Sequence, residues 1–511
     1  MPSQWDHDIS SEEDLARLAE AVAPALRPGD VIALAGPLGA GKTAFARALI
    51  RTLAEPQSVD EVPSPTFTLV QTYDLPRLRL AHFDLYRLDD PSALVELGFD
   101  EALSDGVTLI EWPERAGDML PADRLDVAIE FTADAERRRM RLSGRGEWAA
   151  RLERLKAAAD FVYKAGWGGA RRHYLHGDAS HRAYERLTRA GRSVILMNAP
   201  AQPDGPPIRD GKPYSAIAHL AEDVSAFVAV DRVLREKGFS APEIFASDLD
   251  QGFVLLEDFG EESFVPKAGG PAPERYAAAV DLLMAMRGQS WPETVPIGGG
   301  RAHRVPAYSD EALAIETELL IDWFAPAFGA ALLTAEARRQ FSDLWAAAFA
   351  LLRSEKPIWV LRDFHSPNLM WLADRRGTAR VGLLDFQDAV IGHPAYDLFS
   401  LLQDARIDIP GTLESELYDR YLAAAKTEDG FNSEAFRAAY AVLGAQRNSK
   451  ILGIFTRLWR RDGKTAYLPH MPRVAGYLAR DLDHPALSEL KDWHRRFLPE
   501  ALDPVRLSKV A

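Results

Sequence analysis

The sequence predicts two folded parts in series, an α/β domain followed by a larger α+β domain of two lobes. Residues 30–50 have the pattern of a short apolar strand, a glycine-rich loop and a helix. Residues 147–164 form an Ala- and Leu-rich helical segment, and the glycine-rich run 166–169 that follows indicates a domain boundary. Beyond residue 355, short apolar strands carry acidic residues at fixed spacing. At 511 residues the chain is too long for one ordinary core, since domains have ~100–200 residues.

The composition is that of a globular protein, with 47% hydrophobic and 26% charged residues. No apolar run approaches the ~18 residues of a membrane span, and the N-terminus lacks the basic and then apolar pattern of a signal peptide. We therefore expect a cytoplasmic protein with no membrane partner. The absence of cysteine excludes disulfides, thiol catalysis and cysteine-ligated zinc.

The charge of the chain is unevenly distributed. Residues 1–150 hold 15 Lys and Arg against 27 Asp and Glu, a net charge of −12, whereas the remaining 361 residues have a net charge of −3. Lys and Arg supply the phosphate contacts of nucleic-acid-binding proteins, so the acidic first part is a poor candidate for binding RNA by itself. We expect any role near RNA to depend on a partner protein.

Residues 36–43, with the sequence GPLGAGKT, match the phosphate-binding loop G-x-x-x-x-G-K-[ST]. In such loops backbone N–H groups face a phosphate, the lysine (here Lys42) adds a positive charge, and the final hydroxyl (here Thr43) ligates Mg²⁺. The strand before the loop and the helix after it supply the required context, because a helix N-terminus attracts anions. The alternative is a glycine-rich turn that binds nothing.

Two carboxylates follow at the ends of predicted strands. Residues 80–87 alternate apolar and polar residues, which favours a strand that presents Asp84 on one face, and the buried strand 107–111 ends in Glu111. Ligands of open α/β sheets bind at the carboxyl ends of strands, so both side chains are candidates for holding Mg²⁺ and water. The alternative is two ordinary surface carboxylates. Residues 62–70, VPSPTFTLV, are rigid and hydroxyl-rich, and form either a sensor of the γ-phosphate or a simple edge strand.

The segments GPLGAGKT, SPTFTLV, HFDLYRL and IEWPERAG occur in an order and spacing that resemble the TsaE family, over residues 8–150. TsaE proteins are small bacterial ATPases that assist the synthesis of threonylcarbamoyladenosine in tRNA. The resemblance implies ATP as substrate, Mg²⁺ on Thr43 and Glu111, and Asp84 near the attacking water. It also implies that ATP turnover resets a complex of partner subunits, which carry out the tRNA chemistry, so that tRNA is met only through partners. The ATP-binding residues expected from the motif and the resemblance are Gly36, Gly39, Ala40, Gly41, Lys42, Thr43 and Ala44.

The second part of the chain carries two weaker nucleotide signals. Residues 176–187, HGDASHRAYERL, and residues 193–197 predict two strands joined by a small-residue loop, which would cover ATP phosphates with Ser180 and Arg182. Residues 253–260, FVLLEDFG, predict a strand that runs into an acidic turn. In kinase-like folds such a turn links two lobes and offers hydrogen bonds to adenine, here near Glu257.

The stronger signal is LRDFHSPNLMWL at 361–372, followed by VGLLDF at 381–386. An Asp, an Asn five residues later and an Asp at the end of an apolar strand have the spacing of kinase-type phosphoryl transfer. Asp363 would orient a substrate hydroxyl and accept its proton, and Asn368 and Asp385 would hold Mg²⁺. The alternative is a polar turn between two core strands.

Together with GDASHRAYERL, LLEDFG and residues 382–406, these segments resemble the AmgK sugar kinases of the aminoglycoside phosphotransferase family, over residues 165–490. The resemblance implies transfer of the ATP γ-phosphate to the anomeric hydroxyl of N-acetylmuramate or N-acetylglucosamine in cell-wall recycling. A basic helix at 445–458 agrees with it, although a core helix with a solvated basic face is the simpler interpretation. Two departures stand out. Residues 193–200 contain no phosphate-binding lysine, for which Arg182 is a candidate substitute, and Leu361 replaces the histidine common two residues before the catalytic Asp.

We therefore predict an α/β P-loop NTPase domain followed by an α+β two-lobed protein-kinase-like (aminoglycoside phosphotransferase-like) domain. The predicted parts are a P-loop ATPase domain at 1–155, a helical and glycine-rich linker at 156–168, and kinase-like lobes at 169–262 and 263–511. The predicted function is bifunctional, an ATPase that serves tRNA modification and an amino-sugar kinase. The alternatives are a GTPase-like switch in the first part and, in the second, a kinase for another small hydroxyl compound, such as an aminoglycoside or choline, or an inactive regulatory module.

Overall fold

The computed structural model describes residues 3–54, 62–134, 136–175, 182–202, 205–267, 269–329 and 332–509. The chain divides into two compact units. The first contains Met1–Pro200 and Ile244–Asp258, and the second contains Ala201–Glu243 and Phe259–Ala511. Two sheets, that of the phosphate loop and that of the predicted smaller kinase lobe, therefore belong to the same unit.

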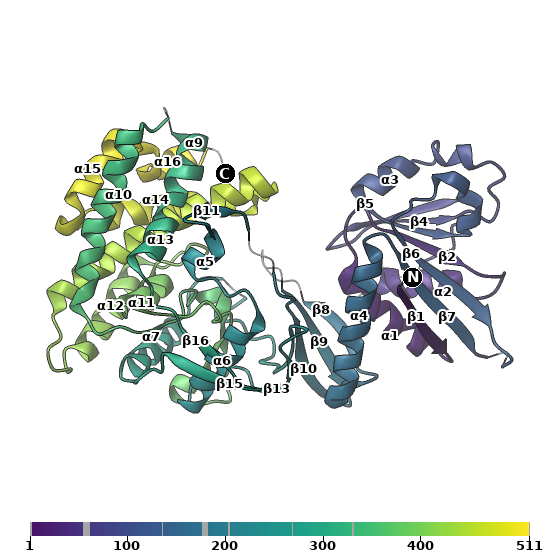
Figure 1. The fold of residues 1–511 in the computed structure, drawn as a ribbon, viewed down its shortest axis with the longest axis horizontal. Helices are drawn as coiled ribbons and strands as arrows, with labels where there is room; N and C mark the ends of the chain where they lie inside the picture. The colour runs from purple at the N-terminus through teal and green to yellow at the C-terminus, as the bar shows by residue number, and fades with distance from the viewer. Residues whose placement is uncertain are drawn as a thin grey trace. The chain divides into compact units, whose positions relative to one another are not determined.

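The first sheet has seven strands among the described residues, in the order β1-β7-β6-β2-β5-β4-β3 (Figure 1). Its centre is parallel, because β2 pairs in parallel with β5 and β6, and β5 pairs in parallel with β4. Strands β7 and β1 on one side and β3 on the other are added antiparallel. The strands are β1 (Ser3–Ile9), β2 (Val31–Ala35), β3 (Val70–Asp74), β4 (Arg79–Asp84), β5 (Gly106–Glu111), β6 (Arg124–Phe131) and β7 (Arg138–Arg145).

Two helices pack against each other and against this sheet. Helix α1 begins after Ser11, whose hydroxyl accepts a hydrogen bond from the Asp14 N–H at 3.1 Å. The apolar faces of α1 and α2 are buried with the inner strands, through Leu18, Phe45 and Leu49. This core holds the loop between β2 and α2 in place. The helices of the domain are α1 (Glu12–Val22), α2 (Lys42–Leu53) and α3 (Phe99–Asp105).

A second sheet in the first unit is antiparallel throughout, in the order β13-β14-β10-β9-β8. Helix α4 (Trp148–Val162) contacts this sheet as well as β1 and β7 of the first sheet (Figure 1). The strands are β8 (Arg171–Leu175), β9 (Ala183–Arg189), β10 (Arg192–Asn198), β13 (Ile244–Asp248) and β14 (Phe253–Glu257).

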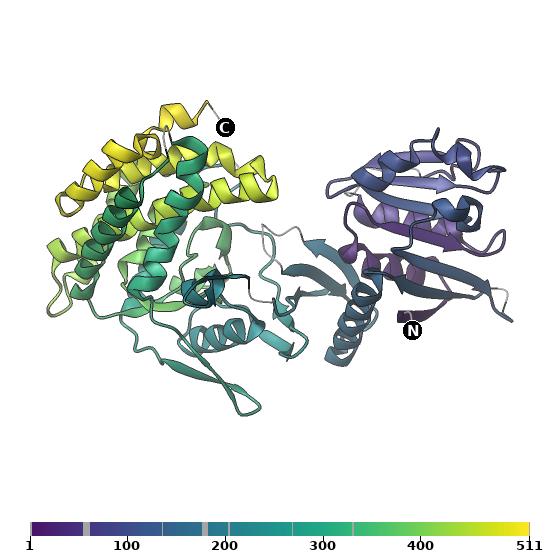
Figure 2. The same ribbon diagram turned by 45° about the horizontal axis from the view of Figure 1, so that its top comes forward.

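The second unit is mainly helical (Figure 2). Its longest helix within the described ranges, α13, packs against α8, α11 and α14. Its principal helices are α6 (Val224–Glu236), α7 (Pro273–Arg287), α8 (Asp310–Leu319), α10 (Ala335–Phe349), α11 (Ala395–Leu402), α12 (Gly411–Ala425), α13 (Ser433–Asp462), α14 (Met471–Asp481) and α15 (Ser488–Phe497). The shorter helices are α5 (Tyr214–Ala218), α9 (Ala325–Phe328) and α16 (Pro504–Leu507).

Short antiparallel strand pairs complete the second unit. Strand β17 pairs with β20, and β18 pairs with β19, so the loops that follow β17 and β19 are held by two small ladders. These strands are β17 (Ile358–Val360), β18 (Leu369–Trp371), β19 (Val381–Leu383) and β20 (Val390–Gly392). The remaining pairs are β11 (Pro207–Arg209) with β12 (Lys212–Pro213), and β15 (Thr294–Gly298) with β16 (Arg301–Arg304).

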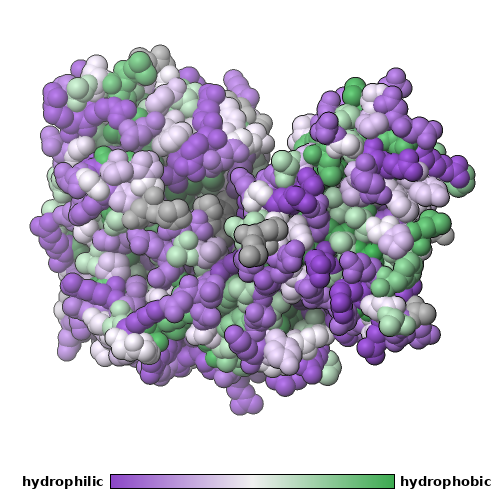
Figure 3. Space-filling model, turned by 45° about the vertical axis from the view of Figure 1, so that its right-hand side comes forward, coloured by the Kyte–Doolittle hydropathy of each residue, from purple (hydrophilic) through white to green (hydrophobic). Residues whose placement is uncertain are grey.

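One face of the protein is largely polar. Figure 3 shows a face on which hydrophilic side chains predominate and hydrophobic ones occur in scattered groups. This agrees with the 26% of charged residues and the net charge of −15. Within the described ranges, the structure contains no helix with the length and apolar character needed to cross a bilayer.

Candidate active sites

The phosphate loop joins β2 to α2 in a conformation that glycine permits. Gly36, Gly39 and Gly41 have φ angles of 151°, 76° and 109°, which L side chains rarely adopt. A Cβ atom on Gly36 would come within 2.5 Å of the carbonyl oxygen of Ile129, so the backbone leaves no room for a larger residue. The loop leads directly into the N-terminus of α2, an arrangement that favours a bound phosphate.

Lys42 is buried against the loop, with 4% of its surface exposed. Its Nζ donates hydrogen bonds to the carbonyl oxygens of Gly36 at 2.8 Å and Pro37 at 3.0 Å. The same atom lies 3.6 Å from the centre of the Trp112 ring, a cation–π contact. Burial lowers the pKa of Lys42, and the negative charge of Glu111 counteracts this effect. The ammonium group is thus held where the loop would enclose a phosphate.

The predicted Mg²⁺ ligands of the first site lie together. Strands β4 and β5 pair in register so that Asp84 lies opposite Glu111, at the carboxyl ends of both strands. The Thr43 hydroxyl donates to one Glu111 oxygen at 3.0 Å, and the other oxygen lies 3.0 Å from Nε2 of His82. His82 is fully buried and Glu111 is 2% exposed. Mg²⁺ takes few protein ligands and completes its shell with water and phosphate oxygens, so this donor pair fits the ion.

Three hydrogen bonds fix the carboxylate of Asp84. It accepts from the hydroxyls of Ser64 at 3.1 Å and Thr66 at 2.5 Å, and from the N–H of Tyr86 at 3.1 Å. Asp84 is 3% exposed. The hydroxyl-rich segment that precedes β3 therefore positions this carboxylate beside the loop.

His82 and Trp112 belong to this site, although the sequence predicts no role for either. His82 precedes Asp84 by two residues on β4, and strand alternation places such residues on the same face of a sheet. The spacing of two residues from Asp84 could have indicated that His82 belongs to the site. The contact of Trp112 with Lys42 joins residues 70 positions apart in the chain, and no local pattern indicates it.

A cavity of about 260 Å³ opens beside the phosphate loop. It lies between the loop, the junction of β1 with α1, and the hairpin formed by β6 and β7. The cavity provides room for a ligand group next to a bound phosphate. Its lining includes Ser11, Ala40, Ala44, Ile129 and Arg138.

The first unit also carries the predicted nucleotide residues of the kinase part. Arg186 on β9 donates two hydrogen bonds to Asp258, at 2.7 and 3.2 Å. Asp258 directly follows Glu257, the last residue of β14, so this pair ties the acidic turn to the sheet. Arg182 directly precedes β9, and Ser180 lies outside the described residues.

Asp363, Asn368 and Asp385 lie together in the second unit, in the segments after β17 and β19. The Asn368 amide donates to the carbonyl oxygen of Asp363 at 3.0 Å and to a carboxylate oxygen of Asp385 at 3.3 Å. Gln387 donates to the other carboxylate oxygen of Asp385 at 3.1 Å. Arg362 and Asp385 have φ angles of 66° and 57°. Such positive values are uncommon for residues other than glycine and are found preferentially at functional sites.

Asp397 of α11 holds the backbone of residues 361–368, the loop after β17 that we call the predicted catalytic loop. Its carboxylate accepts the N–H of Leu361 at 2.7 Å and that of Arg362 at 3.0 Å. Burial raises the pKa of Asp397 to about 7, despite these two hydrogen bonds and the positive charge of Arg447. Leu361 takes part only through its backbone, so the replacement of the usual histidine leaves this anchor in place.

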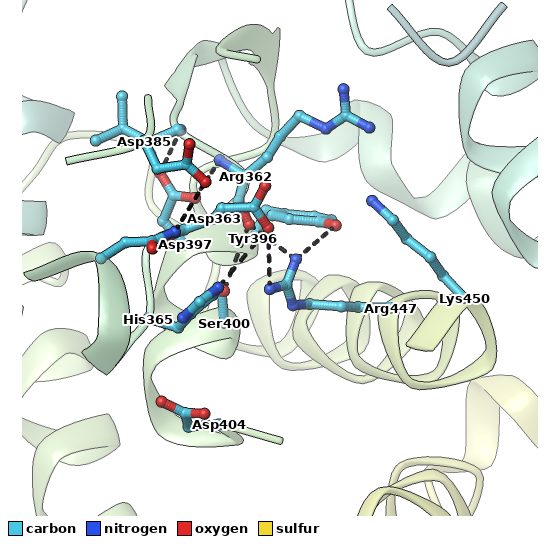
Figure 4. A network of polar contacts seen from close by, with 12 residues as sticks. Arg362, Asp363, His365, Asp385, Tyr396, Asp397, Ser400, Asp404, Arg447 and Lys450 are labelled. Atoms are coloured by element: carbon cyan, nitrogen blue, oxygen red, sulfur yellow. Dashed lines mark hydrogen bonds and ion pairs between the residues drawn. The ribbon is translucent and has the colours of Figure 1, made fainter. Parts of the chain in front are cut away.

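Arg447 reaches Asp363 from helix α13 (Figure 4). One guanidinium nitrogen lies 3.4 Å from the Asp363 carboxylate, and the other donates to the Arg362 carbonyl at 2.8 Å and contacts the Tyr396 hydroxyl at 3.3 Å. Burial alone would raise the pKa of Asp363, but the positive charges of Arg447 and Lys450 outweigh it and hold that pKa well below its usual range. The predicted catalytic carboxylate is therefore kept ionised.

Behind this contact, fully buried Glu316 of α8 gathers several donors. It accepts hydrogen bonds from Lys450 at 2.7 Å, Gln446 at 2.9 Å and the Tyr308 hydroxyl at 2.5 Å, and it forms a buried ion pair with Arg362. Burial would raise the pKa of Glu316, but the charges of Lys450 and Arg362 lower it to about 2. The cluster joins α8 and α13 to the catalytic loop.

The simpler interpretation of the basic helix at 445–458 is wrong for its central residues. Gln446, Arg447, Asn448 and Ser449 are all buried rather than solvated. They are buried because this turn of α13 is surrounded by the loop after β17, α8 and α14, whose polar groups bond to Arg447, Gln446 and Asn448 respectively. The amphipathic pattern alone does not distinguish a polar face directed to solvent from one directed to a polar site.

Comparison with known families agrees with this geometry. Residues 9–140 match the model of the threonylcarbamoyl adenosine biosynthesis protein TsaE, and residues 171–439 match that of the phosphotransferase enzyme family. The predicted fold class is thereby confirmed for both parts.

Individual relatives match each part separately. An N-acetylmuramate/N-acetylglucosamine kinase of Caulobacter vibrioides is 40% identical over 358 residues, which cover 68% of this chain and 97% of that protein. A kinase of the same name from Pseudomonas putida is 32% identical over 61% of this chain and 84% of that protein. A tRNA threonylcarbamoyladenosine biosynthesis protein TsaE of Rickettsia conorii is 41% identical over 124 residues, which cover 24% of this chain and 70% of that protein.

The phosphotransferase model matches more than half of the chain. The TsaE relative of Rickettsia conorii is matched over 70% of its own length. Both matches are extensive enough to assign a family to each part. The chain therefore belongs to the TsaE family in its N-terminal part and to the phosphotransferase enzyme family in its C-terminal part.

Proposed function

We propose that this protein is a bifunctional ATP-using enzyme whose C-terminal part phosphorylates N-acetylmuramate and N-acetylglucosamine at the anomeric hydroxyl. The observation that carries this proposal is the grouping of Asp363, Asn368 and Asp385, with Arg447 beside the first of them. The 40% identity to a kinase of that name supports the choice of substrate. Another small hydroxyl substrate or an inactive module is not favoured.

The catalytic roles in the kinase follow from the contacts of Asp363. The sugar hydroxyl oxygen attacks the γ-phosphorus, and the bond between this phosphorus and the β,γ-bridging oxygen breaks. The hydroxyl proton passes to Asp363. The products are ADP and a sugar 1-phosphate. Because Arg447 keeps Asp363 strongly acidic, this carboxylate chiefly orients the hydroxyl and receives the proton late. A loose transition state needs little proton removal before transfer, so this behaviour suits the reaction.

We propose the predicted metal and nucleotide ligands as follows. Asn368 and Asp385 hold Mg²⁺ in the kinase, and Thr43 and Glu111 hold it in the P-loop domain. When bound, Mg²⁺ would neutralise charge on the ATP phosphates in both sites. The ATP contacts are Gly36, Gly39, Ala40, Gly41, Lys42, Thr43 and Ala44 in the first site and Ser180, Arg182 and Glu257 in the second.

For the N-terminal part we propose an ATPase that serves tRNA threonylcarbamoyladenosine synthesis together with partner subunits. Lys42 contacts the phosphates, and Asp84, held by Ser64 and Thr66, orients the attacking water. The net charge of −12 on residues 1–150 supports contact with tRNA through partners only. Since both reactions use ATP and one concerns tRNA, we place them in the cytoplasm. The functional parts are 1–155, the linker 156–168, and kinase lobes at 169–262 and 263–511.

The kinase is tested by ³¹P NMR of the full chain with ATP, Mg²⁺ and either N-acetylmuramate, N-acetylglucosamine or kanamycin. We expect a new anomeric sugar-phosphate signal with the two amino sugars and none with kanamycin. In Asp363→Asn the signal should disappear while nucleotide binding persists, because Asp363 acts on the hydroxyl rather than on ATP. Product with kanamycin alone, or no product with any acceptor, would contradict the proposed substrate class.

The ATPase is tested by phosphate release in the absence of sugar. We expect Glu111→Gln to slow ATP turnover and to need more Mg²⁺ for the turnover that remains, because it removes a proposed metal ligand. GTP turned over as efficiently as ATP would favour a GTPase-like switch instead.

A further inference from the structure

Helix α4 belongs to two hydrophobic cores of the first unit. Its N-terminal half buries Trp148, Leu152 and Leu155 in the core of the P-loop domain. Its C-terminal half buries Ala158 and Val162 against the second sheet, that of the smaller kinase lobe. Because one helix contributes to both cores, the P-loop domain and this sheet are joined by a packed interface, which we call the junction.

A buried carboxylate reinforces the junction. Glu20 on α1 is 6% exposed and accepts from Arg171 Nε at 2.7 Å and from the N–H of Arg172 at 2.8 Å. Arg172 in turn donates to Glu185 on β9 at 2.7 and 2.8 Å. A chain of charge-assisted hydrogen bonds thus runs from α1 through β8 to β9, and such bonds are stronger than neutral ones.

A cavity of about 370 Å³ lies at this junction, between α1, α2 and β8. Its volume is typical of small-molecule sites, which are usually 300–1,000 Å³. Its charged lining consists of four arginines against two glutamates, with His173 beside them. The charged residues are Glu12, Glu20, Arg47, Arg51, Arg171 and Arg172.

The positive charge in this cavity exceeds what its own carboxylates neutralise. Arg171 is paired with Glu20, and Arg172 with Glu185. Arg47 donates through Nε to the carbonyl of Val62, but among the described residues no carboxylate forms an ion pair with Arg47 or Arg51. As far as residues 3–54 and 62–134 are concerned, the two guanidinium groups of α2 therefore keep their charge available to a ligand. Arginine forks match the geometry of phosphate oxygens.

This cavity adjoins the one beside the phosphate loop. Glu12, Leu15 and Ala44 line both cavities. Helix α2, which carries Arg47 and Arg51, begins at Lys42 of the loop. An anion in the junction cavity would therefore contact the helix that holds the nucleotide phosphates.

We propose that the junction cavity binds the phosphate group of a small phosphorylated ligand, distinct from the two ATP molecules, with Arg51 and Arg47 as its principal contacts. The site requires α1 and α2 from the P-loop domain and β8 from the kinase lobe. It therefore exists only where the two parts are joined in one chain.

The test is calorimetric titration of the full chain with inorganic phosphate and, separately, with N-acetylglucosamine 1-phosphate. Both ATP sites are first saturated with Mg²⁺ and a non-hydrolysable ATP analogue, so that phosphate cannot enter them. We expect saturable binding of one equivalent of inorganic phosphate. For the sugar phosphate, only the binding that Arg51→Gln weakens is assigned to this cavity, because the kinase site also binds its own product. A tighter Kd for the sugar phosphate would identify a sugar phosphate as the ligand, and equal values would identify free phosphate.

Three variants locate the site. Arg51→Gln should weaken binding about tenfold, the size of one lost charged hydrogen bond. Glu12→Gln should strengthen phosphate binding, because it removes a negative charge from the lining. Damage to the fold would weaken binding instead. Arg139→Gln, which alters an exposed arginine of β7 paired with Asp8 at 3.6 Å, should leave the Kd unchanged.

Absence of saturable binding in the parent protein, or the same Kd in all three variants, would overturn the proposal. The titration requires no turnover by either active site. The choice of sugar phosphate as a probe rests on the proposed kinase function, whereas the inorganic phosphate titration does not. A protein that binds phosphate through Arg51 but phosphorylates no sugar would refute the proposed function and leave this site intact.

Discussion

At the scale of single residues, Arg447 holds Asp363, the proposed catalytic carboxylate, in place. It binds the Asp363 carboxylate at 3.4 Å and the carbonyl of Arg362 at 2.8 Å, so it fixes both the side chain and the backbone of the loop. We regard Arg447 as a positioning residue.

We expect Arg447→Gln to lower kcat of the kinase roughly 10²-fold with little change in KM for the sugar, because a misplaced catalytic group costs about that much. The pKa of Asp363 should also rise toward its ordinary value, since a nearby positive charge is lost. The acid limb of the pH–rate profile should therefore move to higher pH, with a larger loss at pH 4 than at pH 8.

The matched control is Arg437→Gln, an exposed arginine on the same helix. It should leave both kcat and the pH profile unchanged. An Arg447→Gln variant whose loss of activity is the same at every pH would show that Arg447 has no electrostatic role.

Glu316 stabilises the fold through its charge. Its folded pKa of about 2 lies below the ordinary value of 4.5, so its contribution is fully present above about pH 5 and is lost as the pH falls from 4.5 to 2. We expect Glu316→Gln to lower the free energy of unfolding by about 3 kcal/mol at neutral pH, because Lys450 and Arg362 lose their buried partner. Urea unfolding measured from pH 7 to pH 3 tests this.

In the parent protein the unfolding free energy should fall over this acid range more steeply than in Glu316→Gln. Glu311→Gln, on an exposed position of the same helix, serves as the control and should match the parent. Equal pH dependence in the parent and Glu316→Gln would refute the assignment.

At the scale of elements, the close packing of α13 on α8 brings Arg447 and Lys450 to the catalytic loop. The contact depends on Gly453, because a Cβ there would lie 2.4 Å from the carbonyl carbon of Leu319. That atom belongs to the backbone, so it cannot move aside without shifting α8.

We expect Gly453→Ala to reduce the free energy of unfolding by 1–3 kcal/mol, the usual cost of overpacking, and to lower kinase activity by displacing α13. Thermal unfolding with parallel kinase assays measures both effects. Gly411→Ala is the control, because open space surrounds that glycine at the start of α12. A Gly453→Ala variant as stable and active as Gly411→Ala would contradict the packing argument.

At the scale of the whole molecule, the two active sites share no described residue. We expect Lys42→Ala to reduce ATP hydrolysis by the P-loop domain by roughly 10²-fold or more, because it removes a charged phosphate contact. Sugar phosphorylation should stay within about twofold of the parent, since Asp363, Asn368 and Asp385 are unaltered.

The reciprocal variant Asp363→Asn should abolish sugar phosphorylation and keep sugar-independent ATP hydrolysis. Measuring both activities in both variants gives a complete comparison. Loss of sugar phosphorylation in Lys42→Ala would mean that the kinase depends on nucleotide in the first site.

The sequence by itself determined the parts of this protein that are local in the chain. The phosphate loop at 36–43 could be predicted because its groups are a few residues apart in the chain. Asp363, Asn368 and Asp385 could be predicted because they have a fixed spacing and follow short apolar strands. The positions of Asp84 and Glu111 followed from the rule that parallel strands end at one edge, and the register of β4 and β5 agrees.

Only the tertiary structure decided how these groups are supported. Arg447 lies 84 residues from Asp363 in the chain, and Glu20 lies 151 residues from Arg171, so no periodic pattern connects them. A buried arginine and a solvated one have the same sequence signature on a helix, and packing alone distinguishes them. The predicted linker at 156–168 begins within helix α4, because the sequence pattern shows a helix but not which cores its two halves enter. Contacts between distant elements are fixed by the packing of complementary surfaces, and that information is spread over the whole chain.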